Sequence, residues 1–219
     1  MVTSAKSRIV VSLVCLALLV AAACSSGPGA PDGATYQEDV LATRANTNRV
    51  FAEAPECGSV SSGDDCSPVP ADRRAVLLPL RYYEFDASYE VPAALRLSDQ
   101  RPVFEMPTST GTLRRMERVG VLDFTVAGER LSLAAFVPEG TVRIDSLFVP
   151  FADRTTGTDT YSAGRYLDLH PTGTGIYTID FNRAYNPYCA YNDSYECPFP
   201  PPSNRLQVSI LAGEKAPGV

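Results

Sequence analysis

Residues 119–137 carry a two-residue alternation that constrains the fold of this chain more than any other feature. Leu122, Phe124 and Val126 alternate with polar residues, a turn follows at 127–129, and apolar residues then return at every second position. Successive side chains of a strand point to opposite faces of a sheet. The pattern therefore predicts a β-hairpin with one face packed in a core.

Other short apolar runs are divided by turn residues in the same way. We expect further strands at 76–84, 90–97, 102–106, 113–118, 144–151, 163–169, 175–182 and 205–212. Strands this close in sequence favour antiparallel neighbours, and no alternation of strands with helices indicates a doubly wound sheet. Residues 76–215 are thus predicted to form a mainly β domain, an antiparallel meander curled into a barrel or sandwich.

One helix is predicted before the strands. Thr35 and Glu38 have the spacing of a capping box, and apolar residues from Tyr36 to Phe51 then recur at helical spacing. We expect an N-terminal amphipathic helix at 35–53 and a single domain that extends to residue 215.

The N-terminus has the marks of an export signal. Lys6 and Arg8 precede an uncharged apolar run at 9–23, which is shorter than the ~20 residues that span a bilayer. The small residues before Cys24 resemble a bacterial lipoprotein cleavage site. We expect residues 1–23 to be removed as a lipoprotein signal peptide. Ordinary cleavage that leaves Cys24 unmodified, and a retained membrane helix, are the alternatives.

Lipidation of Cys24 predicts anchoring on the extracytoplasmic face of the cell membrane, because buried acyl chains hold a protein there. Residues 24–34 are rich in Ser, Gly, Pro and Ala and would form a flexible tether. Removal of residues 1–23 takes away two basic groups, which changes the formal net charge from −6 to −8. Such an acidic chain disfavours nucleic acid as a partner.

Four cysteines remain in the expected domain. They form two local pairs, Cys57 with Cys66 inside a predicted loop at 55–72, and Cys189 with Cys197. Outside the cytoplasm such pairs persist as disulfides, so we expect both to form. A zinc ion held by all four thiolates is the alternative, although the spacings are looser than in common zinc sites.

Polar side chains are densest at 151–166 and 180–189, where each group follows an apolar strand. Such a cluster is either a hydrogen-bonded loop scaffold or the wall of a small-molecule pocket. The candidate ligand-binding residues are Asp153, Arg165, Tyr166, Asp180, Asn182, Tyr185 and Asn186. Seven tyrosines in the C-terminal third would line such a pocket or fill the half-buried positions of a barrel.

Catalytic and metal chemistry has weaker support. Asp153 and Asp159 do not fit a helix-loop-helix calcium site, and His170 has no serine-hydrolase motif beside it. A carboxylate pair could serve a hydrolase if two of its members faced each other. The candidates for such a pair are Asp153, Asp159, Asp168, Asp180 and Glu214. No motif predicts a cofactor or a metal site.

The C-terminal motifs resemble domain of unknown function family 1684, an uncharacterised prokaryotic family. The resemblance rests on the blocks 147–151, 153–166, 180–189, 197–206 and 212–215, and upstream on Arg44, Phe51 and 67–68. It covers about 36–215 and implies one compact domain but no activity. The lipoprotein signal and the Cys57–Cys66 loop depart from the family. If relatives without an export signal keep Cys189 and Cys197, a purely structural disulfide is less secure there, so a thiol or metal role for this pair stays open.

Three functions follow from these observations. The first is an exported lipoprotein whose β domain binds a small polar molecule. The second is a structural or interaction protein of the cell envelope, which predicts an exposed apolar patch. The third is a hydrolase that uses a carboxylate pair in one cleft. The sequence leaves enzymatic activity and the oligomeric state open.

Overall fold

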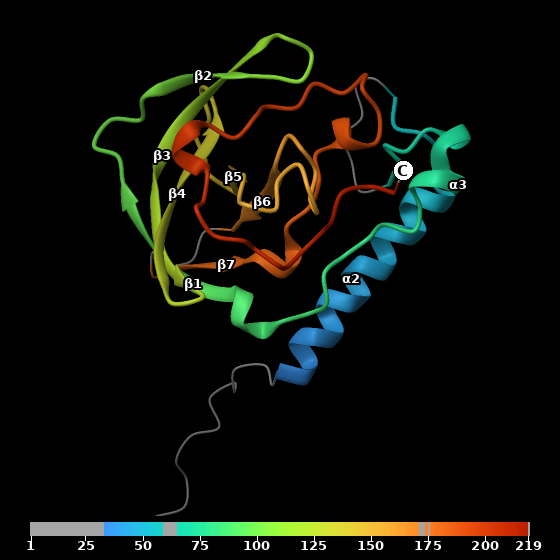
Figure 1. The fold of residues 1–219 in the computed structure, drawn as a ribbon. Coiled ribbons are helices and arrows are strands. Elements are labelled where there is room, and N and C mark those ends of the chain that lie inside the picture. Colours follow the sequence, from blue (N-terminus) through green and yellow to red (C-terminus); the bar gives the residue numbers. More distant parts are fainter. Residues whose placement is uncertain (1–32, 59–64, 171–173, 175, 219) are drawn as a thin grey trace, which may run out of the picture.

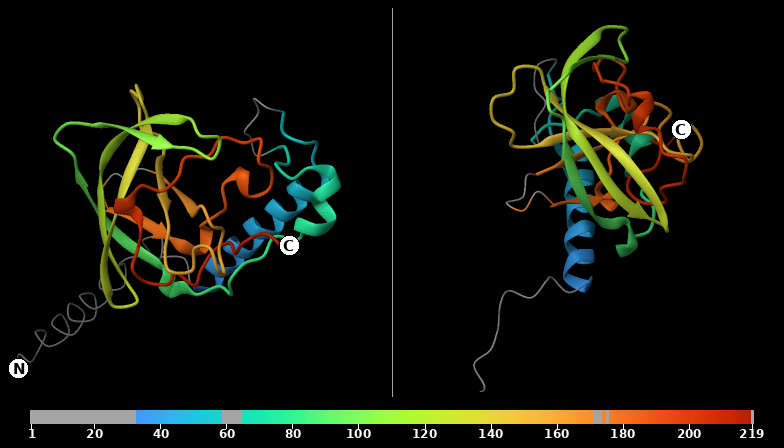
Figure 2. Two further views of the ribbon diagram at one scale, coloured as in Figure 1. Left: turned by 45° about the horizontal axis from the view of Figure 1, so that its top comes forward. Right: turned by 90° about the vertical axis from the view of Figure 1, so that its left-hand side faces the viewer.

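The described part of the chain forms an antiparallel half-barrel flanked by one long N-terminal helix (Figures 1 and 2). A computed structural model describes residues 33–58, 65–170, 174 and 176–218. The mainly β prediction is thereby confirmed. The signal peptide at 1–23, Cys24 and the tether up to residue 32 lie outside the described residues. No helix within the described ranges is long and apolar enough to cross a membrane.

Seven antiparallel strands make up the sheet. They are β1 (Glu90–Leu97), β2 (Val103–Pro107), β3 (Leu113–Val126), β4 (Glu129–Pro138), β5 (Leu147–Phe151), β6 (Arg165–Leu169) and β7 (Ile176–Asp180). The strand order is β6-β5-β4-β3-β1-β7, and β2 pairs with β3 outside this path. The main core fills the concave side and includes Leu122, Leu133 and Ile179.

The predicted hairpin is the β3–β4 pair. Val126 pairs with Glu129, and the two turn residues Ala127 and Gly128 both have positive φ, at 51° and 79°. A two-residue turn of this kind matches the twist of the strands that it joins. The strand predicted at 113–118 is the first half of β3, which continues through a register shift near Gly120. A Cβ at Gly120 would lie 2.5 Å from the Arg96 carbonyl oxygen, so this bend requires glycine.

Two predicted strands are wrong. Residues 76–84 contain the end of a short helix, α3 (Arg74–Leu77), followed by an extended segment with one isolated bridge, Tyr82 to Glu214. Residues 205–212 are extended but form no strand of the sheet. Both segments are apolar because they pack against the body of the protein. Their backbone groups bond to loops and side chains instead of a strand ladder.

The long helix, α2 (Gly33–Glu53), begins before the predicted start, so Thr35 lies inside it and does not cap it. Only Val40 and Phe51 of this helix are buried, and polar contacts supply much of its attachment. Arg44 donates to the Tyr83 and Asn182 carbonyl oxygens at 2.9 and 3.0 Å. These bonds fix α2 against the body of the protein.

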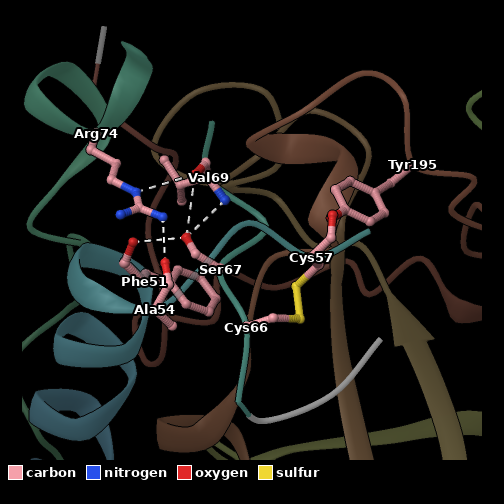
Figure 3. The surroundings of a disulfide bond; sticks show 8 residues. All are labelled: Phe51, Ala54, Cys57, Cys66, Ser67, Val69, Arg74 and Tyr195. Carbon is pink, nitrogen blue, oxygen red and sulfur yellow. Dashed lines mark hydrogen bonds between the residues drawn. A yellow bond between two sulfur atoms is a disulfide. The ribbon is translucent and has the colours of Figure 1, made fainter. Parts of the chain in front are cut away.

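The C-terminal end of α2 is tied to the cysteine-containing loop (Figure 3). Ser67 Oγ donates to the Phe51 carbonyl oxygen at 2.7 Å, and Arg74 donates to the Ala54 carbonyl oxygen at 2.6 Å. Cys57 and Cys66 form the predicted disulfide in the same loop. The last carbonyls of the helix are thus satisfied by side chains that the loop positions.

Short 3-10 helices complete the chain. They are η1 (Ala71–Arg73), η2 (Ala87–Tyr89), η3 (Phe181–Arg183), η4 (Tyr188–Ala190) and η5 (Pro202–Asn204). At the end of η5, the buried Asn204 side chain fills the gap where β4 and β5 share only one paired position. Its amide donates to the Ala134 and Pro150 carbonyl oxygens and accepts from the Ala134 N–H, each at 2.8 Å.

Replacing Asn204 with Ala should therefore destabilise the domain strongly. The change leaves two carbonyls and one N–H buried without partners, and each such group costs ~1–3 kcal/mol. We expect the free energy of unfolding to fall by about 3–5 kcal/mol in urea titrations. The nearby exposed Gln207→Ala is the control and should stay within about 0.5 kcal/mol of the parent protein. Equal unfolding midpoints for the two variants would contradict this role of Asn204.

Candidate functional site

A buried ion pair holds the C-terminal segment inside the half-barrel. Arg165 at the start of β6 lies 2.8 Å from Asp153, and both side chains are excluded from solvent. The same guanidinium donates to the backbone carbonyls of Ile210, Ala212 and Glu214 at 3.1, 2.5 and 3.3 Å. A buried charge is tolerable only when it is paired and hydrogen-bonded, which explains this set of acceptors.

Asp153 is saturated by its neighbours as well. One carboxylate oxygen, Oδ1, accepts from the Thr155 N–H at 2.7 Å and from its hydroxyl at 2.6 Å. Arg165 takes the other oxygen. The ion pair therefore forms a scaffold for the residues that follow it.

Glu214 continues this scaffold into a second buried cluster. Its carboxylate accepts hydrogen bonds from the Tyr191 hydroxyl, from the Asn186 amide at 2.8 Å and from the Asn186 backbone N–H at 3.0 Å. Burial raises the pKa of Glu214 to about 7, although these donors and Arg165 favour the anion. Glu214 thereby joins the C-terminal segment to the loop after β7.

A broad cleft of about 1350 Å³ lies beside this cluster. Figure 1 shows α2 along one side of the molecule and the half-barrel on the other, with the C-terminal segment between them. The cleft is lined by residues of α2, of β3 to β6 and of the loop after β7. Its volume is sufficient for a small-molecule ligand.

Aromatic side chains dominate the cleft wall. They are Phe51, Tyr82, Phe136, Phe148, Tyr166, Tyr185, Tyr188, Tyr191 and Tyr195. The Tyr166 hydroxyl donates to the Pro198 carbonyl oxygen at 2.6 Å, and the Tyr185 hydroxyl donates to Asp168 at 2.5 Å. Burial raises the pKa of both phenols, so they stay neutral donors.

Four arginines also line the cleft. Arg114 pairs with Glu196 and Arg115 pairs with Glu139, both in exposed contacts. Arg183 bonds to Asp180 at 2.9 Å. Arg44 differs from these three because it donates to backbone carbonyls of two separate segments and lies over the Tyr82 ring at 4.7 Å. Burial lowers the pKa of Arg44, which identifies a partly desolvated cation at the cleft.

Three polar atoms of cleft residues lack partners within the described chain. They are Arg44 Nε, Ser146 Oγ and Asn186 Oδ1, which are buried and form no hydrogen bond with described residues. Buried polar groups in proteins are nearly always paired with protein or water. These three atoms are therefore positions at which a ligand or water can bond.

Of the seven candidate ligand-binding residues singled out in the sequence, four line the cleft and three do not. Tyr166, Asn182, Tyr185 and Asn186 line the cleft. Asp153 and Arg165 form the buried ion pair, away from the cleft wall. Asp180 holds the turn into η3 by accepting from the Asn182 N–H at 2.9 Å and does not line the cleft.

Several cleft residues were not predicted. Arg44 and Thr47 come from α2, while Tyr82 and Phe148 come from distant parts of the chain. Arg44 and Phe148 belong to the motifs that resemble the family, but those motifs imply no role for either residue. Tertiary structure brings the four residues together from separate parts of the chain.

The second cysteine pair differs from the prediction. Cys189 and Cys197 are free, buried thiols in the structure, and the predicted disulfide between them is not formed. The Cys189 backbone N–H instead donates to Cys197 Sγ at 3.2 Å, so the thiols meet through hydrogen bonds. The alternative of a zinc ion held by all four thiolates is also wrong, because Cys57 and Cys66 are bonded to each other in a disulfide.

The structure also places the other chemical candidates. His170 is exposed, and its ring nitrogen faces the Asp145 carbonyl oxygen at 3.2 Å. Of the five candidate carboxylates, Asp168 and Glu214 line the cleft, whereas Asp159 contacts Tyr83. Across the described ranges, no group of three or more His, Cys, Asp or Glu side chains is arranged to hold a metal.

The protonation of Glu214 should make stability depend on pH. The folded-state pKa of about 7 is above the usual value of 4.5, so the folded protein binds a proton that the unfolded chain releases. Stability should therefore fall by about 2–3 kcal/mol as pH rises from 4.5 to 7. Urea titrations at several pH values would measure this slope.

Glu214→Gln is the matched variant for this measurement, because it cannot titrate. Its overall stability will differ, but the change of stability that Glu214 causes between pH 4.5 and 7 should vanish. An identical pH profile in the parent and the variant would show that the Glu214 carboxyl has no raised pKa.

Comparison with known proteins agrees with this fold. The model of the family described as "Protein of unknown function (DUF1684)" matches residues 78–215. An uncharacterised protein of Haloarcula marismortui, solved in solution by NMR, is 34% identical, with a TM-score of 0.62. The match covers 82% of this chain and 94% of that chain. No curated protein matches the sequence. The chain therefore belongs to the DUF1684 family of proteins of unknown function.

Proposed function

We propose that this chain is an exported lipoprotein that binds a small molecule in the cleft between α2 and the half-barrel. The observation that carries the proposal is the cleft of about 1350 Å³ with an aromatic wall and buried polar atoms. Ligand sites are typically concave and mostly apolar, with a few placed polar groups that orient the ligand. This combination supports binding more directly than catalysis.

The lining indicates the chemistry of the ligand. Tyrosine rings such as Tyr185 and Tyr188 offer flat apolar surface. Arg44 offers a partly desolvated cation next to Tyr82. Ser146 and Asn186 offer buried oxygens that can accept hydrogen bonds. A small molecule with an apolar or ring-shaped body and a few polar groups fits this set.

Export and anchoring rest on the sequence and on one structural feature. The basic N-terminus, the apolar run and the small residues before Cys24 support removal of residues 1–23 and lipidation of Cys24. The Cys57–Cys66 disulfide is consistent with an oxidising compartment. The domain would then face the extracytoplasmic side of the cell membrane, with α2 as its membrane-proximal element.

Blocking the cleft should remove binding. Thr47 is a half-buried cleft residue of α2, whereas Ala45 is an exposed residue of the same helix that does not line the cleft. Thr47→Trp should fill the cleft, and Ala45→Trp should leave it open. We expect native mass spectrometry of the full chain to show a bound small molecule in the parent and in Ala45→Trp but not in Thr47→Trp.

A fluorescent aromatic anion, 1-anilinonaphthalene-8-sulfonate, provides a second readout. Its emission should rise on addition of the parent protein and of Ala45→Trp. Its affinity for Thr47→Trp should be at least tenfold lower than for the parent protein. If neither a native ligand nor this probe binds the parent protein, the ligand-binding function is wrong. Equal binding to both tryptophan variants would place any binding outside the cleft.

A further inference from the structure

The free thiols of Cys189 and Cys197 form a buried pair that the proposed binding function does not use. Cys189 lies in η4, and Cys197 precedes Pro198. The Cys189 N–H donates to Cys197 Sγ at 3.2 Å, and the two thiols are also hydrogen-bonded to each other. Aromatic side chains enclose the pair, with Tyr166 buried beside the sulfurs.

One member of this pair borders the cleft. Cys197 is among the cleft-lining residues, and Cys189 is not. The loop around Cys197 is fixed by Ser109, whose N–H donates to the Cys197 carbonyl oxygen at 2.9 Å and whose Oγ accepts from the Cys197 N–H at 3.0 Å. A molecule in the cleft would therefore meet Cys197 in a fixed position.

The surroundings favour loss of one proton from the pair. Hydrogen bonds from the Cys197 thiol, Tyr161 and Ser109 lower the pKa of Cys189 to about 7, against the opposing effect of burial. The neighbouring sulfur anion and burial raise the pKa of Cys197. The negative charge therefore lies on Cys189 and the remaining proton on Cys197, where the Cys189 thiolate can accept it when Cys197 reacts.

We propose that Cys189 and Cys197 are a redox pair that exchanges with small disulfide compounds entering the cleft. Cys197 Sγ attacks one sulfur of the compound while its proton passes to the Cys189 thiolate. A mixed disulfide forms, and the other half leaves as a thiolate that takes up this proton. Cys189 thiolate then attacks Cys197 Sγ, which forms the protein disulfide and releases the second thiol. The protein loses two electrons and one proton, the small disulfide gains the two electrons, and the second thiol takes its proton from water.

This redox activity rests on access to the cleft of the proposed function but not on the identity of the ligand bound there, and glutathione tests it directly. The purified full chain is equilibrated with mixtures of reduced and oxidised glutathione, then denatured and alkylated, and peptide mapping follows each cysteine. Cys189 and Cys197 should become protected together as the oxidised fraction rises and should be restored by reduced glutathione. Cys57 and Cys66 should stay protected throughout. Alkylation of Cys189 and Cys197 at every ratio would overturn the proposal.

Two single variants test the order of the steps. Cys189→Ser should trap one glutathione on Cys197, because the second attack is lost. Cys197→Ser should react at least tenfold more slowly, because the remaining thiol does not line the cleft. In the parent protein, the rate of oxidation should rise with pH and level off above about 7. Failure of Cys189→Ser to take up glutathione, or a rate that still climbs steeply at pH 9, would contradict the proposal.

Discussion

The buried guanidinium of Arg165 is the interaction on which the rest of this structure depends. It pairs with Asp153 and donates hydrogen bonds to the backbone carbonyls of Ile210 and Ala212. A half-barrel has an open side, and here the C-terminal segment covers it without joining the sheet (Figure 2). That segment has no strand ladder, so a side chain must satisfy its carbonyls. Removing either member of such a pair leaves an unpaired buried charge, which typically costs ~3–5 kcal/mol.

The cleft follows from this constraint. Once the C-terminal segment is fixed, Glu214 is placed to bind Asn186 and Tyr191, and the loop after β7 is thereby held against the segment. That loop supplies much of the aromatic wall and both free cysteines. Helix α2 closes the other side, where Arg44 binds the backbone of two separate segments. The proposed binding and redox chemistry thus share one scaffold of buried polar contacts.

The sequence predicted the parts of the fold that local patterns determine. The β3–β4 hairpin was recognisable because its alternation and its turn agree, and α2 was recognisable from its helical spacing. Residues 76–84 and 205–212 were mistaken for strands because apolar side chains recur in them, and such a pattern does not reveal where the backbone groups bond. The start of α2 was misplaced because the Thr35–Glu38 pair imitates a cap inside the helix.

The candidate site was only partly predictable for a similar reason. Tyr166, Tyr185 and Asn186 stood out as polar groups at strand ends, and they line the cleft. Asp153 and Arg165 had the same local appearance but form the scaffold, since only tertiary structure shows what a charged side chain meets.

Hydrogen–deuterium exchange of Asp153→Asn tests this scaffold most directly. The account predicts faster exchange at 205–215 and 185–191, while the β3–β4 hairpin stays protected. Unchanged exchange at 205–215 would contradict it.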